Sequence, residues 1–320
     1  MNILDIPIEE PERLFPNDLD EAHAKLRDLI KIWHPDRCSN SNAAAVTQRI
    51  NELYAAVKTK IAAGTWSRPN QVCFAYSGKT IEFNFVRKHV MGEATMYVGN
   101  NALLYNYKDL PWWDTFTFAS SAMQDEMGKY LPHIKYGPVV LDDGSSLLVI
   151  KKTEDQYLLR DLISRIDDAR QVAWIISGIL NINCFLQYNG LCHNAITEDA
   201  LLCSPKYHSV ALTGDWFFAC KQGQKLTALP TDIFKRYAML LHDKVATNRI
   251  DRFQARHLCG TLLNKVPIEI APAPMLAWAN GVPENDAIAE YKHWTTKVLI
   301  DSFGPRKFTP WNISRKDIYG

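Results

Sequence analysis

Residues 29–37 read Leu-Ile-Lys-Ile-Trp-His-Pro-Asp-Arg, and this stretch decides how the first part of the chain folds. Pro35 ends a helix, because proline disfavours helical geometry at the residue before it and cannot donate a backbone hydrogen bond. Apolar residues upstream recur every three to four positions, as on one face of an amphipathic helix. We therefore predict a helix over 20–33, followed by an exposed loop that displays His34 and Asp36.

A second amphipathic helix is predicted over 43–62, with a cap at Ser39, Ser41 or a nearby asparagine. The apolar positions that can face each other across the pair are Ala22, Leu26, Leu29, Ile30 and Trp33 in the first helix and Ala45, Ile50, Leu53, Tyr54 and Val57 in the second.

Over residues 7–63 this arrangement resembles the J-domain of DnaJ-type cochaperones, and residues 11–15 look like a shortened first helix of that domain. A bare His-Pro-Asp tripeptide is also found as a simple helix-ending turn, but Trp33 before it, Arg37 after it and a helix on each side favour the J-domain. The resemblance implies docking on a DnaK-type chaperone and stimulation of its ATP hydrolysis, with no chemistry in this chain. The residues it implies for chaperone binding are Lys25, Arg27 and Lys31 on the helix and His34, Pro35, Asp36 and Arg37 in the loop. The helix carries fewer lysines than is usual for the family.

Composition limits the function classes. The chain has 320 residues, of which 47% are hydrophobic and 22% charged, so we expect two or three globular domains. A formal net charge of +1 gives no global electrostatic reason for nucleic-acid binding. We expect no membrane span and no signal peptide. The seven cysteines form no Cys-x-x-Cys pair, which favours reduced, buried thiols and a cytoplasmic location over disulfides or zinc.

Strands come first and helices follow, which is an α+β order. We predict strands over 79–89, 94–98, 102–107, 139–141 and 146–151, and helices over 117–131, 171–188, 231–241 and 286–302. The predicted organisation is a J-domain over 1–63, a linker over 64–72, a β-rich lobe over 73–153, a helical lobe over 154–304 and a basic, solvated tail over 305–320.

The lobes resemble a degraded protein kinase. Gly92 lies where kinases place the glycine-rich loop over the ATP phosphates, and it is the one glycine of the three that remains. Tyr105 falls where the resemblance places the ATP-binding lysine, with Lys108 three residues later. Glu126 matches the glutamate that pairs with that lysine.

Residues 189–202 resemble the kinase catalytic loop, whose usual pattern is His-Arg-Asp-Leu-Lys-Pro-Glu-Asn. The catalytic aspartate is replaced by Asn194 or Ala195, depending on the register. Asp199 stands where the magnesium-binding asparagine belongs, although ordinary loop solvation explains it as well. We expect His193 to be a buried, hydrogen-bonded residue that braces the loop.

Two further kinase positions follow. Residues 209–217 resemble the hairpin that leads to Asp-Phe-Gly, with either Asp215 or Gly214 at the metal-binding position. Asp232 lies at the start of a predicted helix. The resemblance assigns it the role of the kinase aspartate that braces the catalytic loop from below.

Kinases transfer phosphate by positioning the substrates and neutralising charge, which requires the phosphate-binding lysine and the catalytic aspartate. Because the resemblance places neither residue in this chain, we predict a pseudokinase without phosphotransfer. The first hypothesis is a cytoplasmic adaptor that recruits a DnaK-type chaperone to a client protein, without a cofactor. The second is an atypical kinase or nucleotide-transfer enzyme that uses ATP and magnesium through Lys108, Glu126, Asp199 and Asp215. The third is a protein that brings chaperone help to an assembling complex, such as a virus particle.

Overall fold

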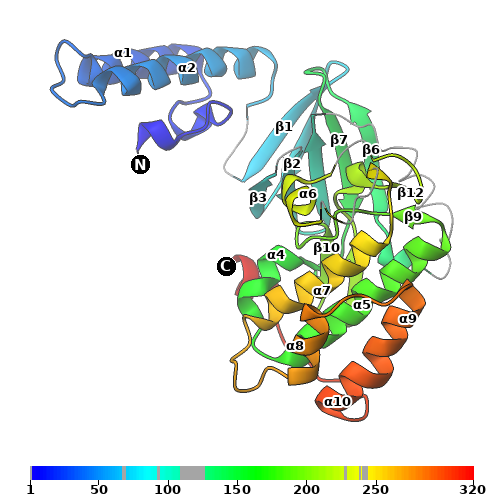
Figure 1. Ribbon diagram of the computed structural model, residues 1–320. Coiled ribbons are helices and arrows are strands. Elements are labelled where there is room, and N and C mark those ends of the chain that lie inside the picture. Colours follow the sequence, from blue (N-terminus) through cyan, green and yellow to red (C-terminus); the bar gives the residue numbers. More distant parts are fainter. Residues whose placement is uncertain are drawn as a thin grey trace. The chain divides into compact units, whose positions relative to one another are not determined.

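The computed structural model describes residues 2–66, 70–91, 94–108, 127–226, 229–237, 239 and 244–320. Its secondary structure is 44% helix and 20% strand, which confirms the α+β class (Figure 1). Contacts divide the chain into two compact units. The first holds Met1–Gly99, Leu104–Lys108 and Pro138–Leu148, and the second holds Asn100–Leu103, Asp109–Gly137 and Val149–Gly320.

The first unit begins with a helical hairpin, formed by α1 (Leu19–Trp33), α2 (Ala43–Ala62) and the loop between them. The two helices lie side by side in Figure 1 and pack along their lengths. Asp18 caps α1, because its Oδ1 accepts the backbone N–H groups of Asp20 and Glu21, both at 2.9 Å. Asn42 holds the N-cap position of α2 without a side-chain bond. Short 3-10 turns at η1 (Ile3–Asp5) and η2 (Pro11–Arg13) precede the hairpin.

The hairpin has its own hydrophobic core. The buried residues come from both helices and from the segment before them: Ile6, Leu14, Phe15, Ala22, Val46, Ile50, Leu53 and Val57. Trp33 and Tyr54 pack against this core while partly exposed. The apolar face of α2 starts at Ala43 and Val46, whereas Ala45, which we predicted to face inward, is exposed.

A β-hairpin follows. Strands β1 (Gln71–Tyr76) and β2 (Lys79–Asn84) pair antiparallel, with Tyr76 opposite Lys79. The two-residue turn has positive φ angles, 50° at Ser77 and 72° at Gly78, which suits the twist of a tight hairpin. Thus β1 begins inside the segment predicted as a linker. The strand predicted over 79–89 is interrupted and resumes as β3 (Arg87–Val90).

Five strands form the main sheet, in the order β3-β4-β5-β7-β6. Their bounds are β4 (Ala94–Val98), β5 (Ala102–Tyr107), β6 (His133–Val140) and β7 (Ser146–Lys151). The central strands β5 and β7 are almost wholly buried, as expected for apolar runs covered on both faces. The strands predicted over 94–98, 102–107 and 146–151 are confirmed, and β6 is longer than predicted. The helix predicted over 117–131 lies mostly outside the described residues, and η3 (Gly128–Tyr130) occupies its end.

The second unit is mainly helical. Its longest helix, α5 (Ala169–Tyr188), starts with a capping box between Asp168 and Gln171 and packs against α7 (Arg249–Leu263) and α9 (Ala287–His293). Among the described residues, α5 is the one helix long and apolar enough to span a membrane. Most of it is buried, as in the core helix of a globular domain. The prediction over 171–188 is confirmed, whereas α7 was not predicted.

The remaining elements of this unit are short. The helices and turns are α4 (Leu159–Leu162), η4 (Ile163–Arg165), η5 (Trp216–Phe218), α6 (Thr231–Tyr237), α8 (Ala273–Asn280), a π turn (Trp294–Val298), α10 (Leu299–Phe303) and α11 (Arg315–Tyr319). The strands are β8 (Tyr157–Leu158), β9 (Leu191–Cys192), β10 (Leu201–Ser204), β11 (Ser209–Leu212) and β12 (Cys220–Lys221). Strands β10 and β11 form an antiparallel hairpin. Only β11 lies within the range 209–217 predicted for a hairpin, so the observed hairpin begins earlier than predicted.

Most residues of the tail over 305–320 are exposed, including its basic residues, as predicted, but several of its apolar side chains pack against their own unit. Ile318 of α11 is buried, and the Tyr319 hydroxyl donates to Asp161 at 2.9 Å. Trp311 contacts Trp174 of α5, with ring centroids 6.3 Å apart. The tail is therefore anchored at a few apolar positions, while its basic side chains stay in solvent.

Candidate functional site

The first candidate site is the loop at the end of α1. The backbone N–H of His34 donates to Ile30 at 2.8 Å and closes the last turn of the helix. Pro35, Asp36 and Arg37 are then exposed, and the Asp36 side chain is 86% accessible. The predicted helix end and exposed tip are confirmed.

Local bonds hold the loop in one shape. The imidazole Nδ1 of His34 accepts the backbone N–H of Asp36 at 3.2 Å, so the neutral ring carries its proton on Nε2. The Thr47 hydroxyl of α2 donates to the carbonyl oxygen of Trp33 at 2.6 Å. This bond links the end of α1 to α2 and so restrains the position from which the loop projects.

Basic residues accompany the loop on α1. Lys25, Arg27 and Lys31 are all exposed. Arg27 and Lys31 are four residues apart and so lie on one side of the helix, whereas Lys25 points away from them. The ammonium of Lys31 lies 3.1 Å from Asp28, which partly neutralises this face.

The second candidate site is the loop after β9, within the second unit. His193 is fully buried, its Nε2 lies 3.0 Å from the carbonyl oxygen of Gly214, and its ring meets Trp216 edge-on with centroids 4.9 Å apart. Burial lowers the pKa of His193 to about 3, so the ring is neutral. The prediction of a buried, bracing histidine is confirmed.

Asp251 of α7 braces this loop from inside the helical core. Its two carboxylate oxygens accept the backbone N–H groups of His193 at 2.9 Å and Asn194 at 2.7 Å. Burial raises the pKa of Asp251 to about 7, against the lowering effect of those two bonds. The next turn of α7 adds Gln254, which accepts from Ile196 and donates to the Asn194 carbonyl, both at 2.8 Å.

We predicted that Asp232 would provide this brace, and that prediction is wrong. Asp232 lies exposed at the start of α6. Sequence reasoning missed Asp251 because α7 itself was missed. A helix whose buried face holds Asp251, Arg252 and Arg256 lacks the apolar periodicity that marks a core helix.

The two residues predicted at the position of the kinase's catalytic base, Asn194 and Ala195, provide no group that could accept a proton. Asn194 has a positive φ of 65°, and its side-chain nitrogen turns inward to the Phe218 carbonyl at 2.9 Å and the Cys220 sulfur at 3.4 Å. Ala195 is buried and has no functional group. A side chain engaged in this way cannot take a proton from a substrate hydroxyl.

The two nearby carboxylates are also engaged. Asp199 forms a bidentate pair with Arg160, with both N···O distances 2.5 Å. Asp215 accepts from the Thr197 hydroxyl at 3.3 Å and has a left-handed φ of 57°. Desolvation, with Asp199 nearby, raises the pKa of Asp215 to about 7. Within the described part of the chain, no group of three or more His, Cys, Asp and Glu side chains could hold a metal ion.

The other predicted kinase positions belong to the first unit or are undescribed. Tyr105 is fully buried on β5, with its ring stacked on Tyr107 at 5.6 Å. Lys108 is exposed just after that strand. Gly92 and Glu126 lie outside the described residues.

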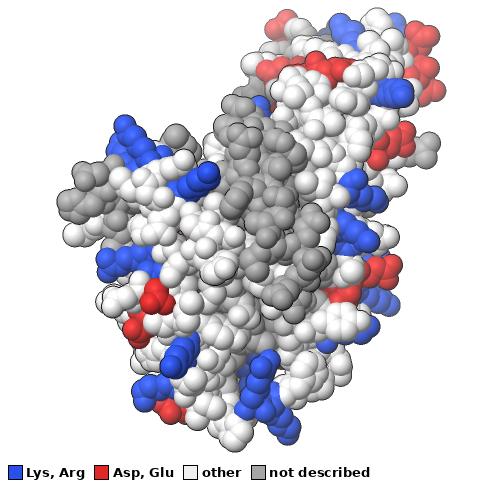
Figure 2. Space-filling model, turned by 90° about the vertical axis from the view of Figure 1, so that its right-hand side faces the viewer, with Lys and Arg blue, Asp and Glu red and all other residues white. Residues whose placement is uncertain are grey.

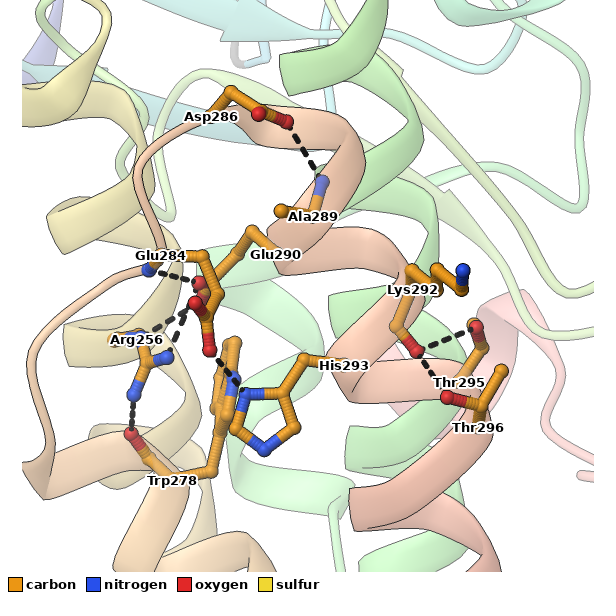
Figure 3. Close-up of polar contacts among 10 residues, drawn as sticks. All are labelled: Arg256, Trp278, Glu284, Asp286, Ala289, Glu290, Lys292, His293, Thr295 and Thr296. Carbon is orange, nitrogen blue, oxygen red and sulfur yellow. Dashed lines mark hydrogen bonds and ion pairs between the residues drawn. The ribbon is translucent and has the colours of Figure 1, made fainter.

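A buried ion pair elsewhere in the second unit has a structural role (Figure 3). Arg256 of α7 donates to Glu290 of α9, from Nε at 2.6 Å and from Nη2 at 3.1 Å, and its guanidinium stacks 4.5 Å from the Trp278 ring centroid. Glu290 also accepts the backbone N–H of Glu284 at 2.6 Å. Every strong acceptor here already has a donor, so the pair joins α7 to α9 and presents nothing to a ligand.

The first unit also contains a pocket of about 680 Å³ between its N-terminal segment and its strands. Apart from Glu9, the charged residues that line it take part in ion pairs with each other. Glu10 meets Lys88 of β3, and Glu12 meets Lys60 of α2, both at 2.5 Å. These pairs hold the segment in place and leave the pocket without a convergent binding charge.

The comparisons with known proteins add no family. No model of a known protein family matches the chain, and no curated protein matches it. The described residues on the face in Figure 2 intersperse Lys and Arg with Asp and Glu. The function must therefore be argued from the two loops themselves.

Proposed function

We propose that this protein is a cochaperone that binds a DnaK-type chaperone through its helical hairpin, stimulates ATP hydrolysis in that partner, and recruits it to a client. The observation that carries the proposal is the exposed His34-Pro35-Asp36 tip at the end of α1. The proposed location is the cytoplasm, in a compartment that supplies the chaperone and its ATP.

The tip suits docking because it is both exposed and pre-organised. The Asp36 carboxylate is open to a partner, and the backbone around His34 is fixed by the bonds to Asp36 and Thr47. A loop that is already ordered loses little conformational entropy on binding, so its polar contacts contribute more fully to affinity. Arg27 and Lys31 add attraction to an acidic surface, which raises the association rate.

The rest of the chain is proposed to be a pseudokinase-like domain that recognises the client. Phosphotransfer needs a lysine on the phosphates, a carboxylate near the attacking hydroxyl and metal ligands. In this chain the corresponding positions hold a buried tyrosine, Tyr105, and the inward-facing Asn194 or Ala195. The Asp199 carboxylate is neutralised by Arg160. An ATP-dependent enzyme is the competing hypothesis, and transfer of labelled phosphate to any protein substrate would support it.

Capture of a purified DnaK-type chaperone tests the binding step. The full chain is immobilised, and retention of the chaperone is compared with ATP, with ADP and with Asp36→Asn. We expect retention that depends on ATP and falls at least tenfold in the variant. The exposed carboxylate at the other end of α1 provides the matched control, since Asp20→Asn should retain the chaperone normally. Equal retention by both variants would contradict the proposal.

A further inference from the structure

Two cysteines face each other where the second candidate loop begins and ends. Strands β9 and β12 are two residues long and antiparallel, and Cys192 lies directly opposite Cys220 in their register. In the other described strand pairs, the cysteines oppose other residues: Cys73 lies opposite Glu82, and Cys203 opposite Val210. All seven cysteines are thiols.

The separation of the two backbones at this position falls within the range that a disulfide can span. Gln222 donates its N–H to Gly190 at 2.8 Å, and these two residues are the opposed pair two steps along the ladder. Antiparallel pairs alternate in type, so Cys192 and Cys220 form a hydrogen-bonded pair with Cα atoms about 5.5 Å apart. Disulfides span Cα separations of roughly 4.4–6.8 Å.

The register puts the two side chains on one side of the strand pair. Opposed residues in a strand pair project their side chains from the same face. The side-chain nitrogen of Asn194 lies 3.4 Å from the Cys192 carbonyl oxygen and 3.4 Å from the Cys220 sulfur, so one amide group links the backbone of Cys192 to the side chain of Cys220.

We propose that Cys192 and Cys220 form a reversible disulfide that acts as a redox switch on the loop between them. A peroxide oxidises the Cys220 thiolate to a sulfenic acid and leaves as water. The Cys192 thiolate then attacks that sulfur, the S–S bond forms, the S–O bond breaks and a second water leaves. Overall, two thiols and one hydrogen peroxide give one disulfide and two waters. A dithiol reverses the reaction by thiol–disulfide exchange.

Accessibility sets the order of the two steps. Cys220 is partly exposed, whereas Cys192 is completely buried, so the oxidant reaches Cys220 first and Cys192 resolves the intermediate. Burial raises the pKa of both thiols, which makes the reaction slow at neutral pH and faster in alkali. The switch therefore responds to sustained oxidation.

The bridge would enclose most of the second candidate site in one covalent ring. Residues 192–220 include His193, Asp199 and Asp215, and the chain between them would lose conformational freedom. The bridge would also consume the Cys220 thiol that accepts from Asn194, while the Asp251 brace remains. Opposed Cβ atoms in such a pair lie slightly farther apart than a relaxed disulfide prefers, so the bond should be strained and easily reduced.

Peptide mapping of the full chain tests this inference independently of chaperone binding. The protein is treated with hydrogen peroxide at pH 7 and at pH 8.5, alkylated, digested without reductant and analysed by mass spectrometry. We expect a cross-linked peptide joining residues 192 and 220, two hydrogens lighter than the separate peptides. It should form faster at the higher pH and disappear with dithiothreitol.

Two variants test whether the cross-link depends on Cys220. Cys220→Ser should abolish the cross-link, and Cys38→Ser, a control far along the chain, should leave it unchanged. The wild-type map decides the matter even if a variant folds poorly. Recovery of Cys192 as a free thiol beside over-oxidised Cys220, or no oxidation of either residue while other thiols react, would overturn the inference.

Discussion

At the scale of single residues, His34 and His193 show how the surroundings assign a role to one side chain. The His34 ring is partly exposed, and its Nδ1 accepts the backbone N–H of Asp36 within the loop, so its Nε2–H remains for a partner. His193 is sealed in the core against Gly214 and Trp216, and burial keeps it neutral. The first is suited to recognition and the second to support.

The pH dependence of stability tests the assignment of His193. The pKa of His193 is about 3 in the folded chain, whereas an unfolded histidine titrates near 6.5. The unfolded state therefore gains a proton first, and the stability that neutral His193 contributes above pH 6.5 is lost as the pH falls toward 3. Between pH 7 and pH 5 the loss should be about 2 kcal/mol.

The matched variant His193→Gln keeps a donor for the Gly214 carbonyl and does not titrate. Urea unfolding at both pH values should show the stability difference between wild type and variant shrinking by roughly that amount, about 2 kcal/mol. A difference that stays constant with pH would mean that His193 is not buried in its neutral form.

A pair of aspartates tests which helix braces the loop. Asp251→Ala leaves the buried N–H groups of His193 and Asn194 without an acceptor, at about 1–3 kcal/mol each, so we expect a loss of roughly 2–6 kcal/mol in the free energy of unfolding. Asp232→Ala removes an exposed carboxylate and should change stability by less than about 0.5 kcal/mol. Denaturant titration of both variants measures this, and equal effects would refute the brace.

At the scale of elements, the helical hairpin depends on a small core between α1 and α2. Leu53 is completely buried there, so Leu53→Ala should destabilise the hairpin by about 2–5 kcal/mol. Trp33 is only partly buried, so Trp33→Ala should lower the free energy of unfolding by less than the loss of a core tryptophan would. In thermal melts of the full chain followed by circular dichroism, Leu53→Ala should lose helical signal at a lower temperature than wild type, whereas exposed Asn51→Ala should melt like wild type. Similar melting of the two variants would contradict the assignment of Leu53 to this core.

The sequence predicted the hairpin closely because every signal for it is local. The apolar spacing, the proline and the loop residues all lie within the two helices and the loop whose structure they determine. The predicted end at Trp33 and the bounds of α2 agree with the structure.

Elements stabilised by remote partners were missed. The charges on the buried face of α7 are satisfied by groups far along the chain, such as Glu290 for Arg256 and the loop amides for Asp251. Likewise, the tail packs because α5 offers Trp174 to Trp311. No local pattern carries such information, so Asp232 took the place of Asp251 in the predicted site.

At the scale of the whole molecule, the proposal divides recognition between the two parts of the chain. The hairpin is proposed to engage the chaperone, and the remainder, whose loop carboxylates are occupied by Arg160 and Thr197, to hold a client. The chemistry would then occur in the partner. This division predicts that a change confined to the tip removes the activity without unfolding any element.

Single-turnover ATP hydrolysis by a purified DnaK-type chaperone tests this most directly, with the full chain added as wild type or His34→Gln. We predict that wild type accelerates hydrolysis at least tenfold and that His34→Gln gives the basal rate. The helical signal of the variant should be unchanged, because exposed substitutions shift stability by less than about 0.5 kcal/mol. Equal acceleration by the variant, or none by the wild type, would contradict the account.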